Sequence, residues 1–382
     1  MKTLNKLLIV TLVGLAFFSS SLFISADAWS VEPIKMRWAS DHGGPPHPAA
    51  IAEVYFAEQV EKRIPGSKVQ IYWARSLYNV PQATEALTEG NLEIMTGQIG
   101  KTVSVDPFFA AAVGPQLLTT PGAINALDSF ETFAMLSKRL KDVHDIKLFG
   151  SGHLSMYMGA GAIKSRMIKP EDFAGQKIRS MSTIENALLK ALGANPTTMA
   201  FGDVPSALQT GVIDGLFTSL GGFNQVKSQA PYFSVAGING IVGDYYWFGA
   251  SGKWWKKLSK EQQEILEDIV VNDFIPFQKK INFCNDRRLV EQYQVTDISK
   301  PGIYVMNPTE AGVIKAAIGD ATAKYIKSIT PAEVDPWVDK FGAEADAAVK
   351  ANPMGSNWLE KCDCSQFADE FKKYKKGMKK RL

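Results

Sequence analysis

The sequence lacks an excess of either charge, and beyond its first residues it lacks an apolar run long enough to cross a membrane. Its 382 residues carry 42 Lys and Arg against 39 Asp and Glu. A balance this even argues against a nucleic-acid partner. A transmembrane helix needs about 20 consecutive apolar residues, and no segment after residue 28 supplies them. With 46% hydrophobic residues, the chain has enough material for two packed lobes.

The one strongly apolar segment lies at the N-terminus and has the form of a secretory signal peptide. Basic residues precede the apolar run 7–18, and Ala26 and Ala28 give the A-x-A pattern of a cleavage site. We therefore expect an exported, periplasmic protein from which residues 1–28 are removed after Ala28, with Ala26 as the other option. An uncleaved membrane anchor is the alternative. No cysteine lies near the cleavage site, so a lipid anchor is not expected.

Cysteine and histidine are scarce. The three cysteines are Cys284, Cys362 and Cys364, and none of the four histidines lies near them in sequence. An odd cysteine count in an exported protein predicts at most one disulfide, from Cys284 to one of the other two, with one thiol left over. Zinc sites combine cysteine and histidine at short fixed spacings that are missing here, so no metal is expected.

The chain also lacks the short motifs of common enzymes. It contains no G-x-S-x-G, no H-E-x-x-H, no phosphate-binding P-loop and no dinucleotide-binding fingerprint. His42 and His47 flank a Gly-Gly-Pro-Pro loop, where they could supply a base or two ligands, or could line a pocket or cap the following helix. We therefore assign no catalytic residue and expect no cofactor.

Hydrophobic periodicity predicts an α/β architecture. The first half alternates strand and helix, with strands expected at 34–40, 68–74 and 92–97 and helices at 50–62 and 80–89. The alternation recurs, with strands expected at 176–181, 196–201 and 212–217 and helices capped by Ser182 and Asp203. Such alternation favours mostly parallel sheets covered by helices. Two α/β lobes with a ligand-binding groove between them are the simplest interpretation.

From Ser259 the pattern stays helical for more than thirty residues, and only Pro276 interrupts it. At about 1.5 Å per residue a helix of this length outreaches one lobe, so we expect it to run along both and to kink near Pro276. The remainder is expected to be helical and to end in a basic tail from Lys372. That tail is expected to be solvated, with contact to acidic lipid as the alternative.

Two cations stand two residues apart in GQKIRS, residues 175–180, where a strand sends both to one face. At the end of a strand facing a groove, the guanidinium of Arg179 could bind a carboxylate through two parallel hydrogen bonds. The alternatives are an ion pair with a nearby acid such as Glu171 or Asp172, or a solvated edge. Lys177 is expected to remain on the surface in every case.

The stretch EDFAGQKIRSMSTIENALLKALGANPTTMAFGDVPSALQTGVIDG, residues 171–215, resembles the substrate-binding proteins of tripartite ATP-independent periplasmic (TRAP) transporters, the DctP-type solute receptors. Residues 47–77 and 85–97 are similar to the family's opening strands and helix, so the resemblance covers about 34–294. It implies an α/β, two-lobed periplasmic-binding-protein-like fold with a central cleft and a long lobe-spanning helix. It further implies a receptor that delivers a small carboxylate ligand to membrane permease subunits, and it leaves the oligomeric state open.

In that family the arginine of the G-x-K-x-R segment binds the ligand's carboxylate, and here it is Arg179. The resemblance implies that Phe201 stacks on the ligand and that Thr218 lies against it. The full set of expected site residues is Arg179, Phe201, Thr218, Ser182, Asp41, His42, Gln98, Phe217 and Tyr246. Phe201 as core filler, and Asp41 and His42 as turn residues, are the alternatives. The aromatic stretch 243–255 could face the cleft, which would suit an aromatic or apolar-tailed acid, or pack under the long helix.

The sequence departs from the family pattern at Gly159, where many relatives carry a second arginine. This puts in doubt a second charge contact and a ligand resembling sialic acid. The C-terminal extension after about Pro331 also looks longer than usual. The expected domains are a first lobe at 29–155, a second lobe at 156–243, a return to the first lobe at 244–284, and a helical region at 285–382 that packs on the second lobe.

The resulting hypothesis is a receptor that performs no chemistry. One alternative is a secreted hydrolase or lyase that uses Asp41, His42 or His47 on the cleft rim. Another is a surface-interaction protein that binds through its aromatic stretch and basic tail.

Overall fold

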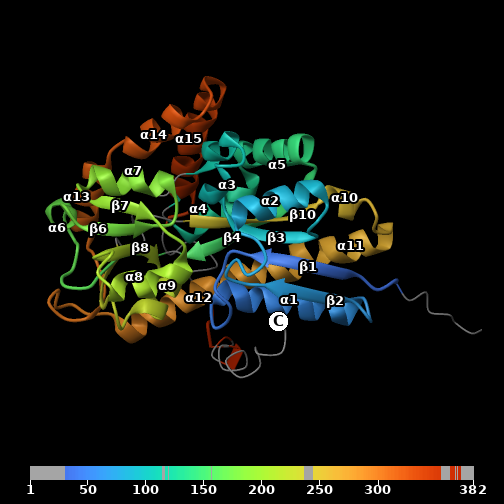
Figure 1. The fold of residues 1–382 in the computed structure, drawn as a ribbon, viewed down its shortest axis with the longest axis horizontal. Coiled ribbons are helices and arrows are strands. Elements are labelled where there is room, and N and C mark those ends of the chain that lie inside the picture. Colours follow the sequence, from blue (N-terminus) through green and yellow to red (C-terminus); the bar gives the residue numbers. More distant parts are fainter. Residues whose placement is uncertain are drawn as a thin grey trace, which may run out of the picture.

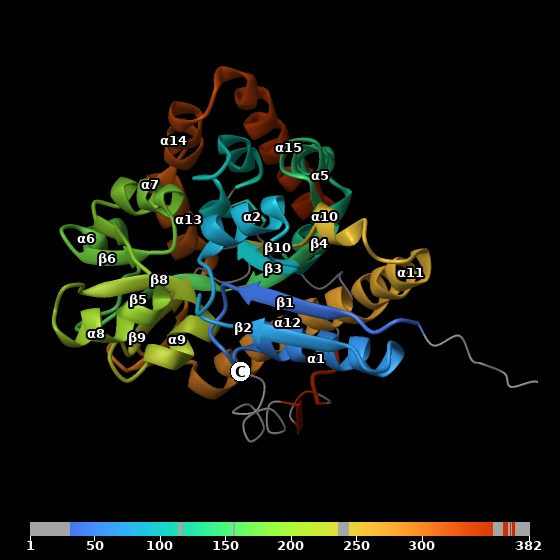
Figure 2. The ribbon, with the colours of Figure 1, turned by 45° about the vertical axis from the view of Figure 1, so that its right-hand side comes forward.

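The computed structural model describes residues 31–113, 117–118, 120–155, 157–235, 244–353, 362–365, 367 and 369–370. The expected signal peptide, its cleavage site and the basic tail lie outside these ranges. The described residues form two α/β lobes that lie side by side, as Figures 1 and 2 show. None of the described helices combines the length and the apolar character that crossing a membrane requires.

A five-stranded sheet forms the centre of the first lobe, in the order β2-β1-β3-β10-β4. Its strands are β1 (Lys35–Ser40), β2 (Lys68–Tyr72), β3 (Ile94–Gln98), β4 (Ile146–Ser155) and β10 (Asp244–Ser251). Only β10 of these five strands runs against the others. The lobe's helices are α1 (Pro48–Arg63), α2 (Val80–Glu89), α3 (Ile99–Thr102), α4 (Pro121–Ala126), α5 (Glu131–His144) and α10 (Gly252–Trp255), with 3₁₀ turns at Pro107–Ala112 and Leu127–Ser129.

The aromatic stretch on β10 divides between the two faces of this sheet. Phe248 stacks on Trp38 with ring centroids 5.0 Å apart and lies 4.9 Å from the ring of Phe274, beside the long helix. On the opposite face, Tyr245 donates to the carbonyl of Ala112, and Trp247 donates to a side chain of α3. The stretch is therefore mostly core, because strand residues alternate between two buried faces.

The second lobe is built on a six-stranded sheet in the order β11-β9-β5-β8-β6-β7, in which only β5 is reversed. Its strands are β5 (Met158–Ala162), β6 (Lys177–Ser180), β7 (Asn195–Thr198), β8 (Gly215–Ser219), β9 (Tyr232–Val235) and β11 (Gly302–Val305). Its helices are α6 (Pro170–Phe173), α7 (Thr183–Ala191), α8 (Val204–Gln209), α9 (Leu220–Val226) and α13 (Pro308–Ile318). The prediction of two lobes with mostly parallel sheets is confirmed.

Local sequence signals position the helices that border the cleft. Ser182 and Glu185 form the predicted capping box of α7, and Gly193 after that helix has a φ of +83°. Asp203 is the N-cap residue of α8 as predicted, but it ends a 3₁₀ turn at Phe201–Asp203 and its side chain makes no capping hydrogen bond.

The predicted long helix runs without a break from α11 (Lys260–Asp268) through a π-helical segment (Ile269–Phe274) into α12 (Ile275–Tyr293). It contacts α1 and β4 of the first lobe and α9 and β11 of the second. The π-helical segment ends at Phe274, two residues before Pro276. Proline cannot donate a backbone hydrogen bond, so the helix accommodates it by changing its hydrogen-bond pattern at that point.

After the long helix the chain crosses back over both lobes. Helix α13 packs on α6 and α7 of the second lobe, and α14 (Ala321–Ile329) contacts both α7 and the 3₁₀ turn Pro107–Ala112. A 3₁₀ turn at Ala332–Val334 leads into α15 (Asp335–Ala351), which lies on α4 and α5 of the first lobe (Figure 1). We expected this whole region on the second lobe. The difference at α15 arises because its apolar face, with Phe341 at the centre, is buried against the first lobe, where Glu344 accepts hydrogen bonds from Thr132.

The predicted disulfide is present, and it joins Cys284 on α12 to Cys364. Cys362 is the thiol left over, and it is buried. Its Sγ lies 3.7 Å from the Sγ of Cys284, so both members of the Cys362–Cys364 pair stand beside the same partner.

Candidate ligand-binding site

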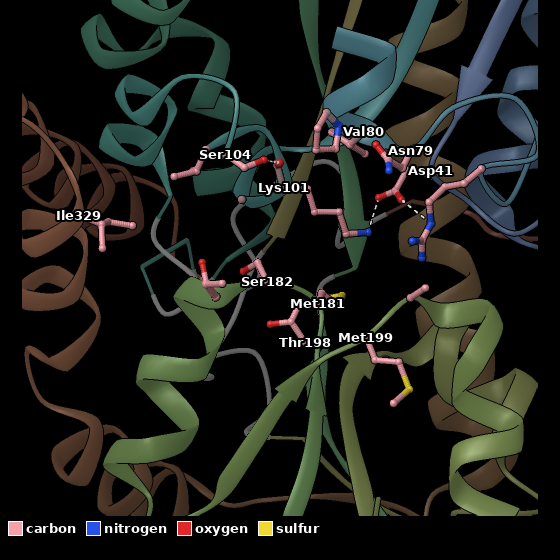
Figure 3. Close-up of a pocket in the computed structure, with 16 residues that line it drawn as sticks. Asp41, Asn79, Val80, Lys101, Ser104, Met181, Ser182, Thr198, Met199 and Ile329 are labelled. Carbon is pink, nitrogen blue, oxygen red and sulfur yellow. Dashed lines mark hydrogen bonds and ion pairs between the residues drawn. The ribbon is translucent and has the colours of Figure 1, made fainter. Parts of the chain in front are cut away.

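The cleft between the lobes contains two neighbouring compartments. The small compartment, of about 50 Å³, contains Arg179 in its wall, and the large compartment measures about 440 Å³. Both are lined by Asp41, Lys101 and Met181, which we call the neck. These residues follow β1, β3 and β6, so the site lies where parallel strands end, the usual ligand position in open α/β sheets. In Figure 3 the two lobes face each other across the large compartment.

Arg179 is 98% buried on β6, because only 2% of its surface is exposed. Its Nε donates to the carbonyl of Met199 at 2.9 Å, and its Nη1 donates to that of Phe217 at 3.3 Å. No described residue accepts a hydrogen bond from its Nη2. Burial lowers the pKa of Arg179 to about 10, so the guanidinium remains charged at neutral pH. The two carbonyls fix the direction of a buried cation that has donors to spare.

Neighbouring residues of the second lobe surround this guanidinium. The ring of Phe201 lies 5.6 Å from the central carbon of Arg179, within range of a cation–π contact, and Thr218 is buried in the same wall. Phe217 contributes its carbonyl to Arg179, while its side chain belongs to the lobe's core. Lys177, on the same strand, is exposed and donates to the carbonyl of Gly211, as expected of a surface residue.

Asp41 joins two cations from the first lobe. Its Oδ2 accepts from Lys101 Nζ at 2.5 Å, and its Oδ1 lies 3.9 Å from Nε of Arg75. The carboxylate itself is buried, although both cations are partly exposed. Lys101 lies in α3, whereas Arg75 follows β2 in a turn with a φ of +63°. With Arg179, the two compartments thus carry three cations and one acid, which favours an anion.

The two histidines form part of the wall. Their rings stack with centroids 5.1 Å apart, and His47 Nδ1 accepts from the backbone of Ala49, so it caps α1. Burial lowers the pKa of His47 to about 4 and holds that of His42 well below its usual range. Both rings are therefore neutral at pH 7. The helix-capping interpretation of His47 is confirmed by this geometry.

Glu53, which the sequence did not single out, lies behind His42. Its carboxyl group accepts from Ser40 and Thr96 at 2.7 Å each and from Trp73 at 2.8 Å, and His42 Nε2 is 3.5 Å away. Burial raises the pKa of Glu53 to about 7, against the opposing effect of these hydrogen bonds. Because His42 is uncharged, this contact is not an ion pair.

The remaining expected residues lie at different depths. Tyr246 of β10 packs edge-on against His42, with ring centroids 3.9 Å apart, and lines the small compartment. Ser182 lines the large compartment, where a Cβ at Gly100 of the opposite lobe would stand only 3.2 Å from its Oγ. Gln98 is buried at the end of β3 and lines neither compartment.

Several lining residues were not predicted. They belong to the large compartment and are Arg75, Asn79, Val80, Pro81, Val103, Ser104, Met199 and Ile329. Figure 3 shows Ile329 on the far side of the compartment from Asp41. This isoleucine ends α14, is 36% exposed, and reaches the cleft only because the C-terminal helices cross it. No local pattern could have indicated that position.

Gly159 occupies a site where no side chain fits. It lies on β5, and a Cβ there would stand 2.0 Å from the backbone oxygen of Ser234 on β9. The close approach of these strands accounts for the glycine, and Arg179 is the arginine that this sheet presents to the small compartment.

Comparison with known proteins identifies the family. Residues 39–328 match the family model of bacterial extracellular solute-binding proteins, family 7. The chain belongs to this family. Within it, the chain is 26% identical over 355 residues to the C4-dicarboxylate-binding periplasmic protein DctP of Rhodobacter capsulatus, a match that covers 91% of this chain and 98% of that protein. The predicted resemblance to TRAP solute receptors is confirmed, and the family is one of binding proteins.

Solved structures of TRAP periplasmic solute-binding proteins share the fold. A TRAP periplasmic solute-binding protein of Sulfitobacter sp. NAS-14.1 with bound β-D-galacturonate matches with a TM-score of 0.70 and 22% identity, over 81% of this chain and 99% of that one. A TRAP protein of Sulfurospirillum deleyianum with bound succinate matches with a TM-score of 0.70 and 21% identity, over 81% of this chain and 98% of that one.

Proposed function

We propose that this protein is an exported receptor that binds a small organic acid between its lobes and delivers it to the membrane subunits of a TRAP transporter. The observation that carries the proposal is the buried guanidinium of Arg179, which is oriented by two carbonyls and keeps Nη2 for a ligand. Membership in the solute-binding family supports it. A carboxylate fits this fork, because its two oxygens accept parallel hydrogen bonds.

The remaining expected residues have supporting roles in this proposal. Phe201 covers the guanidinium and excludes water from the bound carboxylate, while Lys101 adds a second positive charge at the neck. Tyr246 and Thr218 close the small compartment from opposite lobes. Since the compartment draws on both lobes, a bound acid favours the closed arrangement through contacts that it makes only there.

The names of the relatives are consistent with this ligand class. DctP of Rhodobacter capsulatus is named for C4-dicarboxylates, and the two solved structures hold galacturonate and succinate. All of these compounds are carboxylates. For this chain we propose the carboxylate group itself, together with export after cleavage near Ala28 and release of the ligand to permease subunits.

A thermal-shift screen tests the proposal. The purified protein is heated with monocarboxylates, dicarboxylates, sugar acids and aromatic acids, each matched to its primary amide as an uncharged control. At a concentration 100 times Kd, a ligand adds about 2.7 kcal/mol of stability, which gives a clear rise in Tm. We expect at least one acid to raise Tm and its amide to have no effect. Recovery of the acid unchanged supports a receptor, whereas turnover would establish the hydrolase or lyase alternative.

A further inference from the structure

We infer that the ligand is an amphiphilic acid, whose carboxylate occupies the small compartment and whose apolar tail occupies the large one. This inference rests on the proposed function and specifies the ligand class. The two compartments differ almost ninefold in volume, about 50 Å³ against about 440 Å³. The small one has room for a carboxylate group or a few water molecules, since one water needs about 10–15 Å³.

The wall of the large compartment is mainly apolar. Its apolar lining residues come from five separate segments of the chain and are Val80, Pro81, Val103, Met181, Met199, Ala200 and Ile329. Compartments of about 300–1,000 Å³ with such walls are typical of small-molecule sites, and burying an apolar group in one is favourable by about 25 cal/mol per Å². A ligand confined to the small compartment would leave this surface to water.

Four polar side chains around the large compartment already make hydrogen bonds within the protein. Asn79 Oδ1 accepts from the backbone of α2, and Ser182 Oγ accepts from the backbone of α7. Ser104 donates to the carbonyl of Lys101, and Thr198 hydrogen-bonds with Ser180 and Asn186. A polyhydroxylated acid would need free partners for its hydroxyl groups, and an acid with an alkyl or aryl tail needs none.

One buried cation and two apolar residues each belong to a single compartment. Asp41 and Lys101 line both compartments and Arg75 lines the large one, while Arg179 lines only the small one. Ile329 and Val103 line the large compartment only. An acid lying along this path places its carboxylate on Arg179, passes the neck, and buries its tail between α2, α3 and α14.

Isothermal titration with a chain-length series tests the inference. The probes are butanoate, hexanoate and octanoate, with succinate and galacturonate as polar acids. We expect affinity to rise about fourfold for each added methylene until the compartment is full, because each buried CH₂ contributes about 0.8 kcal/mol. Equal affinity for butanoate and octanoate, or tighter binding of succinate or galacturonate than of every monocarboxylate, would overturn the tail inference and leave the proposed function standing.

Two variants sharpen the result. Ile329→Ser should weaken octanoate about threefold or more and leave butanoate unchanged, because only the longer acid reaches α14. The matched control is Ile298→Ser, at an isoleucine that is 49% exposed and lines neither compartment. A loss for octanoate in the control alone would contradict the placement of the tail. Arg179→Met should abolish binding of every acid, and unaltered binding there would refute the proposed function itself.

Discussion

Replacing Arg179 by lysine keeps the positive charge and removes the fork, so it isolates the geometry on which the proposed function depends. In the wild-type protein, Nε and Nη1 hold the carbonyls of Met199 and Phe217, and the guanidinium still faces the small compartment. A lysine ammonium carries its donors on one nitrogen and cannot hold both carbonyls and grip both oxygens of a carboxylate.

The expected loss of ligand affinity follows from the number of hydrogen bonds that the exchange removes. A charge-assisted hydrogen bond contributes about 1.5–3 kcal/mol, and the exchange removes one of the two that a carboxylate would form. Arg179→Lys should therefore weaken an acid ligand about tenfold to a hundredfold. Because the site is buried, one unpaired carbonyl should also cost the folded state about 1–3 kcal/mol.

Isothermal titration measures the affinity, and thermal unfolding followed by circular dichroism checks that the variant folds. The matched control is the reverse exchange two residues earlier, Lys177→Arg, at an exposed position on the same strand. We expect that control to bind like the wild type. Unchanged affinity in a folded Arg179→Lys protein would refute the fork geometry.

Two further predictions concern the core and the sulfur cluster. His153 is fully buried, and neither ring nitrogen has a partner among the described residues. Burial lowers the pKa of His153 to about 3 in the folded protein. Only the unfolded chain therefore takes up a proton on this side chain as pH falls below about 6.5. His153→Leu should reduce the loss of unfolding free energy between about pH 8 and pH 5 by about 2 kcal/mol, measured by urea titration at both pH values, and an identical loss in both proteins would contradict this account. Cys284→Ser should cost about 4 kcal/mol, because it opens a loop whose ends are 80 residues apart, whereas Cys364→Ser should cost much less because Cys362 can pair in its place. Peptide mapping without reductant should find Cys284 joined to Cys362 in the second variant, and two free thiols there would exclude the substitution of partners.

The sequence predicted those parts of the fold whose causes are local. The capping box of Ser182 and Glu185 and the left-handed Gly90 that ends α2 require only neighbouring residues, and the structure contains both. The aromatic stretch on β10 had two possible placements, and both occur along one face of the strand. Tyr246 lines the cleft, whereas Phe248 packs beside the long helix.

The site was predictable where one segment carried it and unpredictable where distant segments meet. Arg179 followed from a family resemblance in a continuous stretch, and the structure places it in the cleft wall. Arg75 takes its position from a turn with positive φ, and Glu53 takes its position from the burial of a helix face. The spacing of residues in the sequence therefore predicts neither of them as part of the site. The packing of α15 on the first lobe depends on a surface that forms only once residues more than 200 positions apart have come together.

The far wall of the large compartment belongs to a helix near the end of the chain. Helix α14 contributes Ile329 to the cleft, yet it lies outside both sheets and makes no strand pairing. Substitutions at this helix end can therefore alter the size of the accepted molecule while the two sheets and the guanidinium stay as they are. In this architecture, the ligand specificity of the receptor can change while the two-lobed scaffold is conserved.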